Sequence, residues 1–123
     1  MITMTAIKKG VHSCFDEALD ESHELKENEH TIGYIRFHER EEGKGAWIEF
    51  ILAKERSKRY GDKIIQYVFD HFPFEYVEGT SIYEPHFFWK RIGATFDDEV
   101  DEDACDGTYF ILYRENFYQA IQN

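Results

Sequence analysis

The chain has 123 residues, of which 42% are hydrophobic and 17% aromatic, and it carries a formal net charge of -11. This length fits a single domain spanning residues 1–123, and the aromatic share is enough for a packed core and argues against disorder. The acidic balance argues against general nucleic-acid binding, and no apolar run reaches the ~18 residues of a membrane span. Two cysteines, Cys14 and Cys105, are too few for a disulfide framework. We therefore expect a cytoplasmic protein without nucleic-acid or membrane partners.

The first half of the chain predicts a strand, a helix and a hairpin. Residues 2–7 can form a short strand, and the apolar spacing over residues 13–25 is typical of a helix. Residues 31–40 are rich in β-branched and aromatic side chains, and residues 46–53 form a central strand that is apolar except at Glu49. The charged, glycine-rich turn between these two strands makes them a hairpin.

The second half predicts two helices and three strands. The apolar stripe over residues 60–72 indicates a helix, and residues 75–83 indicate a strand. Residues 85–93 begin with proline and end with glycine, as a short helix does. Two further strands, 94–100 and 108–116, are joined by an acidic loop. Because a helix connects the central strand to the next strand, we expect one parallel pair in a mixed α/β sheet.

A basic stretch, RSKRYGDK, lies immediately ahead of the helix at 60–72. Five of the fourteen lysines and arginines gather around it: Lys54, Arg56, Lys58, Arg59 and Lys63. Cations at the positive end of a helix are unfavourable by roughly 0.3–1 kcal/mol each when exposed. The unpaired N–H groups of a helix start, however, bind anions. The pattern therefore predicts a phosphate or pyrophosphate site, and the alternative is a solvated basic loop whose charges pair with the surplus carboxylates.

Two motifs carry a family resemblance. The segment AWIEFILAKERSKRYGDKIIQYVFDHF resembles the central motif of the GNAT family of acetyl-CoA-dependent N-acyltransferases, a strand followed by Arg/Gln-x-x-Gly-x-Gly/Ala and a long helix. Arg56 matches the first position of that motif and Gly61 the last. The segment EPHFFWKRIGATF is similar to the next motif of the family, through Phe88, Trp89, Lys90 and Gly93. The resemblance implies a GNAT-like α/β (α+β) fold, with a mixed central sheet flanked by helices.

The resemblance also implies a cosubstrate and a reaction. Acetyl-CoA would place its pyrophosphate against Arg56, Ser57, Lys58, Arg59, Tyr60, Gly61 and Asp62. Its thioester end would run beside the strand at Ile51 and Ala53, and the second motif would add Trp89. Gly61 suits such a site because a missing Cβ lets an anion approach the backbone. The implied activity is transfer of an acetyl or other acyl group to a primary amine by direct attack, the acceptor being a small molecule, a protein lysine or an N-terminus.

Two residues depart from the family pattern. Arg59 stands where the first motif has its first glycine, and it either binds phosphate or obstructs it. Trp89 stands where many members have a tyrosine that acts as a general acid, whereas an indole N–H has no usable acidity near neutral pH. These departures motivate an alternative, a non-catalytic GNAT-fold module that binds CoA or a protein. A third interpretation is an acidic interaction protein that mimics a polyanion.

Glu49 is the candidate catalytic base, because it is the lone charge in an apolar strand and could take a proton from an incoming ammonium group. The alternative is an outward carboxylate, or one that pairs with Arg36 across the hairpin. We expect no metal site, since the six histidines lack His-x-x-x-His spacing and the acidic run at 97–106 does not fit a calcium loop. That run is either a solvated loop or an attractor of a cationic acceptor.

Overall fold

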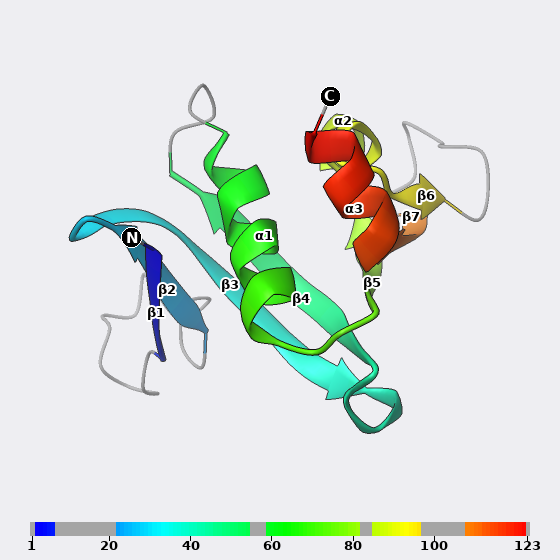
Figure 1. Cartoon of the computed structure of the whole chain (residues 1–123), viewed down its shortest axis with the longest axis horizontal. Coiled ribbons are helices and arrows are strands. Elements are labelled where there is room, and N and C mark those ends of the chain that lie inside the picture. Colours follow the sequence, from blue (N-terminus) through cyan, green and yellow to red (C-terminus); the bar gives the residue numbers. More distant parts are fainter. Residues whose placement is uncertain (1, 7–21, 55–58, 82–84, 97–107, 123) are drawn as a thin grey trace. The chain divides into compact units, whose positions relative to one another are not determined.

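The computed structural model describes residues 2–6, 22–54, 59–81, 85–96 and 108–122. These residues form a seven-stranded sheet in the order β1-β2-β3-β4-β5-β7-β6, accompanied by helices α1, α2 and α3 (Figure 1). The strands are β1 (Ile2–Ala6), β2 (His23–Glu27), β3 (His30–Arg40), β4 (Gly45–Ala53), β5 (Tyr76–Ser81), β6 (Thr95–Phe96) and β7 (Thr108–Tyr113). The helices are α1 (Tyr60–His71), α2 (Pro85–Arg91) and α3 (Arg114–Ile121), and a short 3-10 turn, η2 (Glu41–Gly43), connects β3 to β4.

The pairing of the strands makes the sheet mixed. β4 and β5 are parallel, with Gly45 opposite Tyr76, while β5–β7 and β6–β7 are antiparallel. The predicted mixed α/β sheet and its single helical crossover are therefore confirmed. By its internal contacts the chain divides into unit 1 (Met1–Phe37 and Glu49–Asp70) and unit 2 (His38–Ile48 and His71–Asn123).

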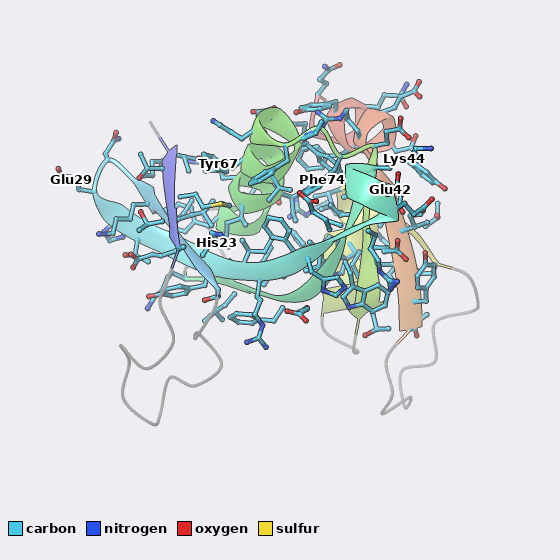
Figure 2. The ribbon with its side chains drawn as sticks, turned by 90° about the horizontal axis from the view of Figure 1, so that it is seen from below. His23, Glu29, Glu42, Lys44, Tyr67 and Phe74 are labelled. Carbon is cyan, nitrogen blue, oxygen red and sulfur yellow. The ribbon has the colours of Figure 1, made fainter. Side chains whose placement is uncertain are left out.

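In unit 1, helix α1 lies directly on β3 and β4 (Figure 2). A Cβ at Gly33 would collide with the carbonyl oxygen of Leu52 and would lie 2.6 Å from Cδ1 of Ile64, so only glycine permits this approach. The apolar stripe of α1 is buried through Ile64, Ile65, Val68 and Phe69. Burying each such side chain stabilises the fold by about 1.5–3 kcal/mol. The α1 start is therefore held firmly against the end of β4.

In unit 2, an aromatic core covers one face of β7. The Trp89 ring of α2 stacks on Phe110 with centroids 4.0 Å apart, and Leu112 and Phe117 are fully buried. Helix α2 ends in a Schellman motif, in which Ala94 N–H donates to the Trp89 carbonyl at 2.9 Å and Gly93 N–H donates to Lys90 at 3.1 Å. Gly93 has φ +105°, as the predicted glycine cap requires.

The predictions for two segments are wrong. Residues 23–25 belong to β2 instead of the end of a helix, because β2 pairs with both β1 and β3 and fully buries Leu25. Residues 114–116 begin helix α3 instead of ending a strand, because alternation stops at Tyr113 and Phe117 becomes the buried anchor of a helix. No helix within the described ranges is both long and apolar enough to span a membrane.

Several sequence predictions fall outside the described residues. These are the helix before residue 22, the acidic run at 97–106, Cys14 and Cys105. The strand predicted at 75–83 is described only as far as Ser81, and the strand predicted at 94–100 only as far as Phe96. They stay predictions.

Candidate functional site

The start of α1 is the centre of the predicted anion site, and it lies in unit 1. The first helical hydrogen bond runs from Lys63 N–H to the Arg59 carbonyl at 3.3 Å. The N–H groups of Tyr60 and Gly61 therefore precede the hydrogen-bonded ladder, at the positive end of the helix. Both residues are buried, which fixes the helix start. Arg56, Ser57 and Lys58 lie outside the described residues.

Arg59 has a backbone conformation that normally selects glycine. Its φ is +55°, in the left-handed region, where a residue with a Cβ is destabilised by about 1–2 kcal/mol. The GNAT motif has a glycine at this position, so the conformation accounts for the glycine of the motif. The Arg59 side chain is exposed, and no acidic side chain among the described residues forms an ion pair with it. The Arg59 residue therefore places a positive charge at the α1 N-terminus although its backbone conformation is strained.

The other described cations of this region have partners. Lys63 Nζ lies 2.7 Å from Glu27 Oε2 and 5.5 Å from the centre of the Tyr60 ring. The hydrogen bond from Lys63 lowers the pKa of Glu27 below its usual value. Lys54 Nζ lies 5.7 Å from the centre of the Tyr34 ring. The alternative that basic charges pair with surplus carboxylates is therefore confirmed for Lys63. Sequence reasoning missed Glu27, because β2 was not predicted as a strand.

The end of β4 supplies the residues predicted to line the acyl arm. Ile51 and Ala53 are partly exposed, while Leu52 between them is 45% exposed. Lys54 N–H donates to the Ile32 carbonyl at 2.8 Å, so β3 anchors the backbone up to the point where the loop begins. The strand end and the α1 start thus belong to one packed unit.

Glu49, the candidate base, lies on β4 beside Arg36 of β3. Glu49 Oε2 is 3.1 Å from Arg36 Nε, and the Glu49 side chain is 40% exposed. The Arg36 guanidinium also lies 5.9 Å from the centre of the Phe50 ring. The cross-hairpin ion pair, one of the alternatives for Glu49, is confirmed. Its role as a base stays a prediction.

Trp89 lies in unit 2 and is only 2% exposed. Besides the stack on Phe110, its ring packs edge-on against the Phe88 ring, with the ring centroids 4.9 Å apart. Its observed role is core packing, and a contact to the cosubstrate stays a prediction. In the described part of the chain, no group of three side chains of the metal-ligating types lies close enough to hold an ion.

No protein-family model matches the chain, and no curated protein is similar to it in sequence. Solved structures do resemble it in fold. Mutant forms of the spermidine/spermine N-acetyltransferase SpeG from Vibrio cholerae match with a TM-score of 0.63 and 10% identity, over 97% of this chain and 98% of that protein. Tetrahymena GCN5 matches with a TM-score of 0.59 and 20% identity, over 75% of this chain and 66% of that protein.

A third similar structure was solved with coenzyme A. N-acetylglutamate synthase from Neisseria gonorrhoeae, complexed with coenzyme A and N-acetyl-glutamate, matches with a TM-score of 0.61 and 9% identity over 92% of this chain. The match covers only 35% of that enzyme, so the chain spans about a third of its length. At these identities the similarity concerns the fold and not the activity. The chain has the fold of the GNAT acetyltransferases.

Proposed function

We propose that the chain is a single acyl-CoA-binding domain, located in the cytoplasm, that transfers an acetyl or related acyl group to a primary amine by direct attack. The observation that carries this proposal is the left-handed Arg59 directly ahead of the α1 N-terminus, at the end of β4 in a GNAT fold. An anion site at this place is what a CoA pyrophosphate requires.

The residues at the α1 start fit such a ligand. The Tyr60 and Gly61 N–H groups precede the helical ladder, and Gly61 has no Cβ to keep an anion away from the backbone. Arg59 would add a charge-assisted contact, worth about 1.5–3 kcal/mol when well formed. Asp62 would contribute only its backbone, since its carboxylate repels phosphate. Arg56, Ser57 and Lys58 complete the proposed phosphate contacts, and Trp89 remains a proposed contact of the second motif.

The acyl transfer itself needs an acyl group, a positioned carbonyl and a base. Acetyl-CoA would supply the acyl group as a thioester. Backbone groups at Ile51 and Ala53 would orient it, and Glu49 would take the proton of the acceptor ammonium, directly or through water. Arg36, 3.1 Å from Glu49, would hold the carboxylate in position. We assign no proton transfer to Trp89, because an indole has no usable acidity.

The class of acceptor follows from the neighbours only as a proposal. SpeG is named for spermidine and spermine, and N-acetylglutamate synthase was solved with N-acetyl-glutamate, so both handle small molecules that carry an amine or an acetylated amine. A small-molecule amine is therefore our first choice, ahead of a protein lysine or N-terminus.

A second candidate is a non-catalytic GNAT-fold module that binds CoA or a protein. The Arg36–Glu49 ion pair favours it, because the pair gives the Glu49 carboxylate a structural role across the hairpin. A measurement of acyl transfer distinguishes the two candidates. A measurement of CoA binding does not, because both the enzyme and the CoA-binding module bind CoA.

The first test is a thermal shift with acetyl-CoA, CoA and an unrelated nucleotide. A ligand present at about 100 times its Kd should add about 2.7 kcal/mol to the free energy of unfolding. We expect stabilisation by both CoA species and none by the nucleotide. Absence of a shift at millimolar acetyl-CoA would contradict the proposal.

Catalysis is then tested by thiol release from acetyl-CoA across a panel of amines. A rate that rises with one amine and saturates supports the enzyme, and it should fall in Glu49→Gln if this carboxylate is the base. Glu29→Gln, at an exposed carboxylate of unit 1, is the matched surface control. Firm CoA binding with no thiol release from any amine favours the non-catalytic module.

A further inference from the structure

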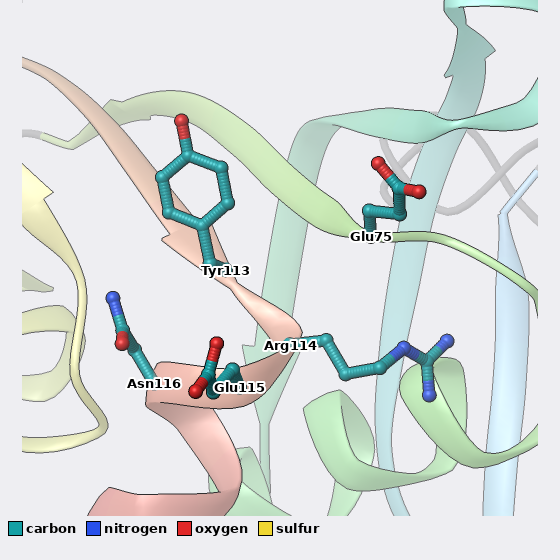
Figure 3. Close-up of a pocket in the computed structure, with 5 residues that line it drawn as sticks. All are labelled: Glu75, Tyr113, Arg114, Glu115 and Asn116. Carbon is teal, nitrogen blue, oxygen red and sulfur yellow. The ribbon is translucent and has the colours of Figure 1, made fainter.

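Unit 2 contains a recess where the chain passes from β7 into α3. It has a volume of about 530 Å³, and five residues line it: Glu75, Tyr113, Arg114, Glu115 and Asn116 (Figure 3). Glu75 directly precedes β5, whereas α2 follows the other end of that strand. The β7–α3 recess shares no residue with the α1 start and does not depend on the proposed transfer activity.

The one basic side chain of the β7–α3 recess is already engaged inside unit 2. Arg114 Nε donates to the Phe74 carbonyl at 2.8 Å, and a terminal Arg114 nitrogen donates to the Phe72 carbonyl at 2.6 Å. The Arg114 backbone N–H donates to the Glu75 carbonyl at 2.8 Å. In Figure 3 the arginine side chain extends away from Tyr113 and Asn116. The guanidinium therefore fixes the wall of the recess and does not face its interior.

An aromatic ring forms the opposite wall. Tyr113 is 47% exposed. Its ring lies 6.2 Å from that of Tyr76, whose hydroxyl donates to Glu41. Burial, followed by the bond to Glu41, raises the pKa of Tyr76 well above its usual range, so this donor is retained at neutral pH. The Tyr113 ring is thus backed by a fixed neighbour while much of its surface stays open to a ligand.

The charges of the lining favour a cation. Glu75, just ahead of β5, and Glu115, on α3, are exposed carboxylates of the lining, and Asn116 beside Glu115 adds an amide (Figure 3). The α3 N-terminus contributes only about half a positive charge. Arg114 is bound to the Phe72 and Phe74 carbonyls, so the carboxylates of Glu75 and Glu115 outweigh the helix dipole. An anion would be repelled, and a purely apolar ligand would leave the carboxylates unused.

We propose that the β7–α3 recess binds an alkylammonium group, with the ammonium between the carboxylates of Glu75 and Glu115 and its alkyl arm or charge against the Tyr113 ring. An exposed cation–π contact and two carboxylates are each modest, so the affinity should be weak and salt-dependent. The group can come from a free amine or from a lysine side chain of another polypeptide, and the two sources share this chemistry.

The test is a titration followed by backbone-amide NMR of the whole chain at low salt. The probes are n-butylammonium, the lysine peptide acetyl-Gly-Lys-Gly-amide, and two ligands of similar size, butyrate and butanol. We expect saturable shifts at Tyr113, Glu115 and Asn116 with at least one ammonium probe and none with butyrate or butanol. A response to the peptide alone identifies a polypeptide lysine as the ligand, and a response to n-butylammonium alone identifies a free amine.

Variants fix the location of the site. Glu115→Gln and Tyr113→Leu should each weaken ammonium binding by about threefold, whereas Glu29→Gln, an exposed carboxylate of unit 1, should leave it unchanged. Melting temperatures like that of the wild type show that each variant is folded. The proposal is overturned if butyrate or butanol produces the same shifts, if neither ammonium probe shifts these amides, or if Glu115→Gln and Glu29→Gln have the same effect.

Discussion

Lys63 of α1 and Glu27 of β2 form an ion pair, with Nζ 2.7 Å from one carboxylate oxygen and 3.0 Å from the other. The pair removes one cation from those available at the α1 start, because Lys63 is directed to β2. Arg59, one turn earlier, is exposed. Of these two cations, Lys63 is therefore engaged within unit 1, and Arg59 is the one that we propose contacts a ligand.

Glu27→Gln should release Lys63 and strengthen binding of acetyl-CoA. One more cation near the phosphates is worth about two- to fivefold in affinity at a solvent-exposed site. Calorimetric titration at low and high salt measures this gain, which should shrink as salt screens the charge. Glu29→Gln is the control for a change of net charge alone. An unchanged or weaker affinity in Glu27→Gln would contradict the assignment of Lys63.

The same pair should make stability depend on acid pH. The pKa of Glu27 is lowered in the fold from its ordinary value of 4.5, so its contribution is complete above that pH and is lost as pH falls through the lower, folded value. Urea unfolding across this range should show a smaller loss of stability in Glu27→Gln than in the wild type. Parallel curves for the two proteins would show that the pair does not act on stability.

Arg59→Gly should separate folding from binding. Glycine accepts φ +55° without the penalty of about 1–2 kcal/mol, but it costs about 0.5–1 kcal/mol in chain entropy. We therefore expect the free energy of unfolding to stay unchanged or to rise by up to about 1 kcal/mol. Acetyl-CoA affinity should fall about tenfold, since a charge-assisted contact is lost.

Arg59→Ala is the matched variant for that comparison. It removes the same charge but keeps the strain, so it should lose affinity as Arg59→Gly does without gaining stability. Urea unfolding and calorimetry on both variants check the two effects. Tighter binding in Arg59→Gly would mean that the arginine obstructs the phosphate instead of contacting it.

Gly93→Ala should destabilise unit 2 strongly. The residue has φ +105°, and a Cβ there would lie 2.7 Å from the carbonyl oxygen of Asn116. Strain and overpacking together should cost about 2–4 kcal/mol. Gly43→Ala is the control, because Gly43 has a similar φ of +94° and a Cβ there would make only an ordinary contact, 3.9 Å from a Glu39 carboxylate oxygen. It should lose only the strain, about 1–2 kcal/mol. Equal losses in urea unfolding would contradict the packing argument.

His23 should make the fold sensitive to mildly acidic pH. Burial lowers the pKa of His23 from its ordinary 6.5, and its Nδ1 is buried with no hydrogen-bond partner among the described atoms. Because the unfolded chain binds the proton more readily, stability is complete above pH 6.5 and declines below it. His23→Phe should flatten this decline while keeping the ring stack on Phe37, which His23 makes at 5.7 Å.

His30→Gln provides the control for that measurement, since His30 is exposed at the start of β3. The unfolding free energy is measured on both sides of pH 6.5. Its change with pH should be smaller in His23→Phe than in the wild type, and it should be the same in His30→Gln as in the wild type. An unchanged slope in His23→Phe would assign the pH dependence to other groups.

The elements with strong periodicity could be predicted from sequence. The stripe of α1 and the aromatic, β-branched run of β3 gave bounds within one or two residues of those observed. The proline and glycine that bracket α2 marked its start and its cap correctly. In each case a local signal agrees with the packing of the folded chain.

The missed elements lacked such local signals. β2 has the sequence HELKE, in which Glu, Leu and Lys have good helix propensity, and only pairing with β1 and β3 makes it a strand. Helix α3 follows β7 without any loop, so the alternation of TYFILY hid the point at which the helix begins.

For the candidate site, the local sequence predicts the position but not the pairing of the charges. Its location follows from a strand, a basic loop and a helix in sequence. Its charge pairing did not follow, because the Lys63–Glu27 pair joins residues 36 positions apart. Trp89 was assigned to the site by its motif, whereas its stack on Phe110 depends on the fold of unit 2.

The most direct test of the account is backbone-amide NMR of the chain titrated with acetyl-CoA. We predict saturable shifts at Arg59, Tyr60 and Gly61, with smaller shifts at Ile51 and Ala53, and a loss of affinity in Arg59→Ala. If millimolar acetyl-CoA leaves the Tyr60 and Gly61 amides unchanged, the proposed cosubstrate site at the start of α1 is wrong.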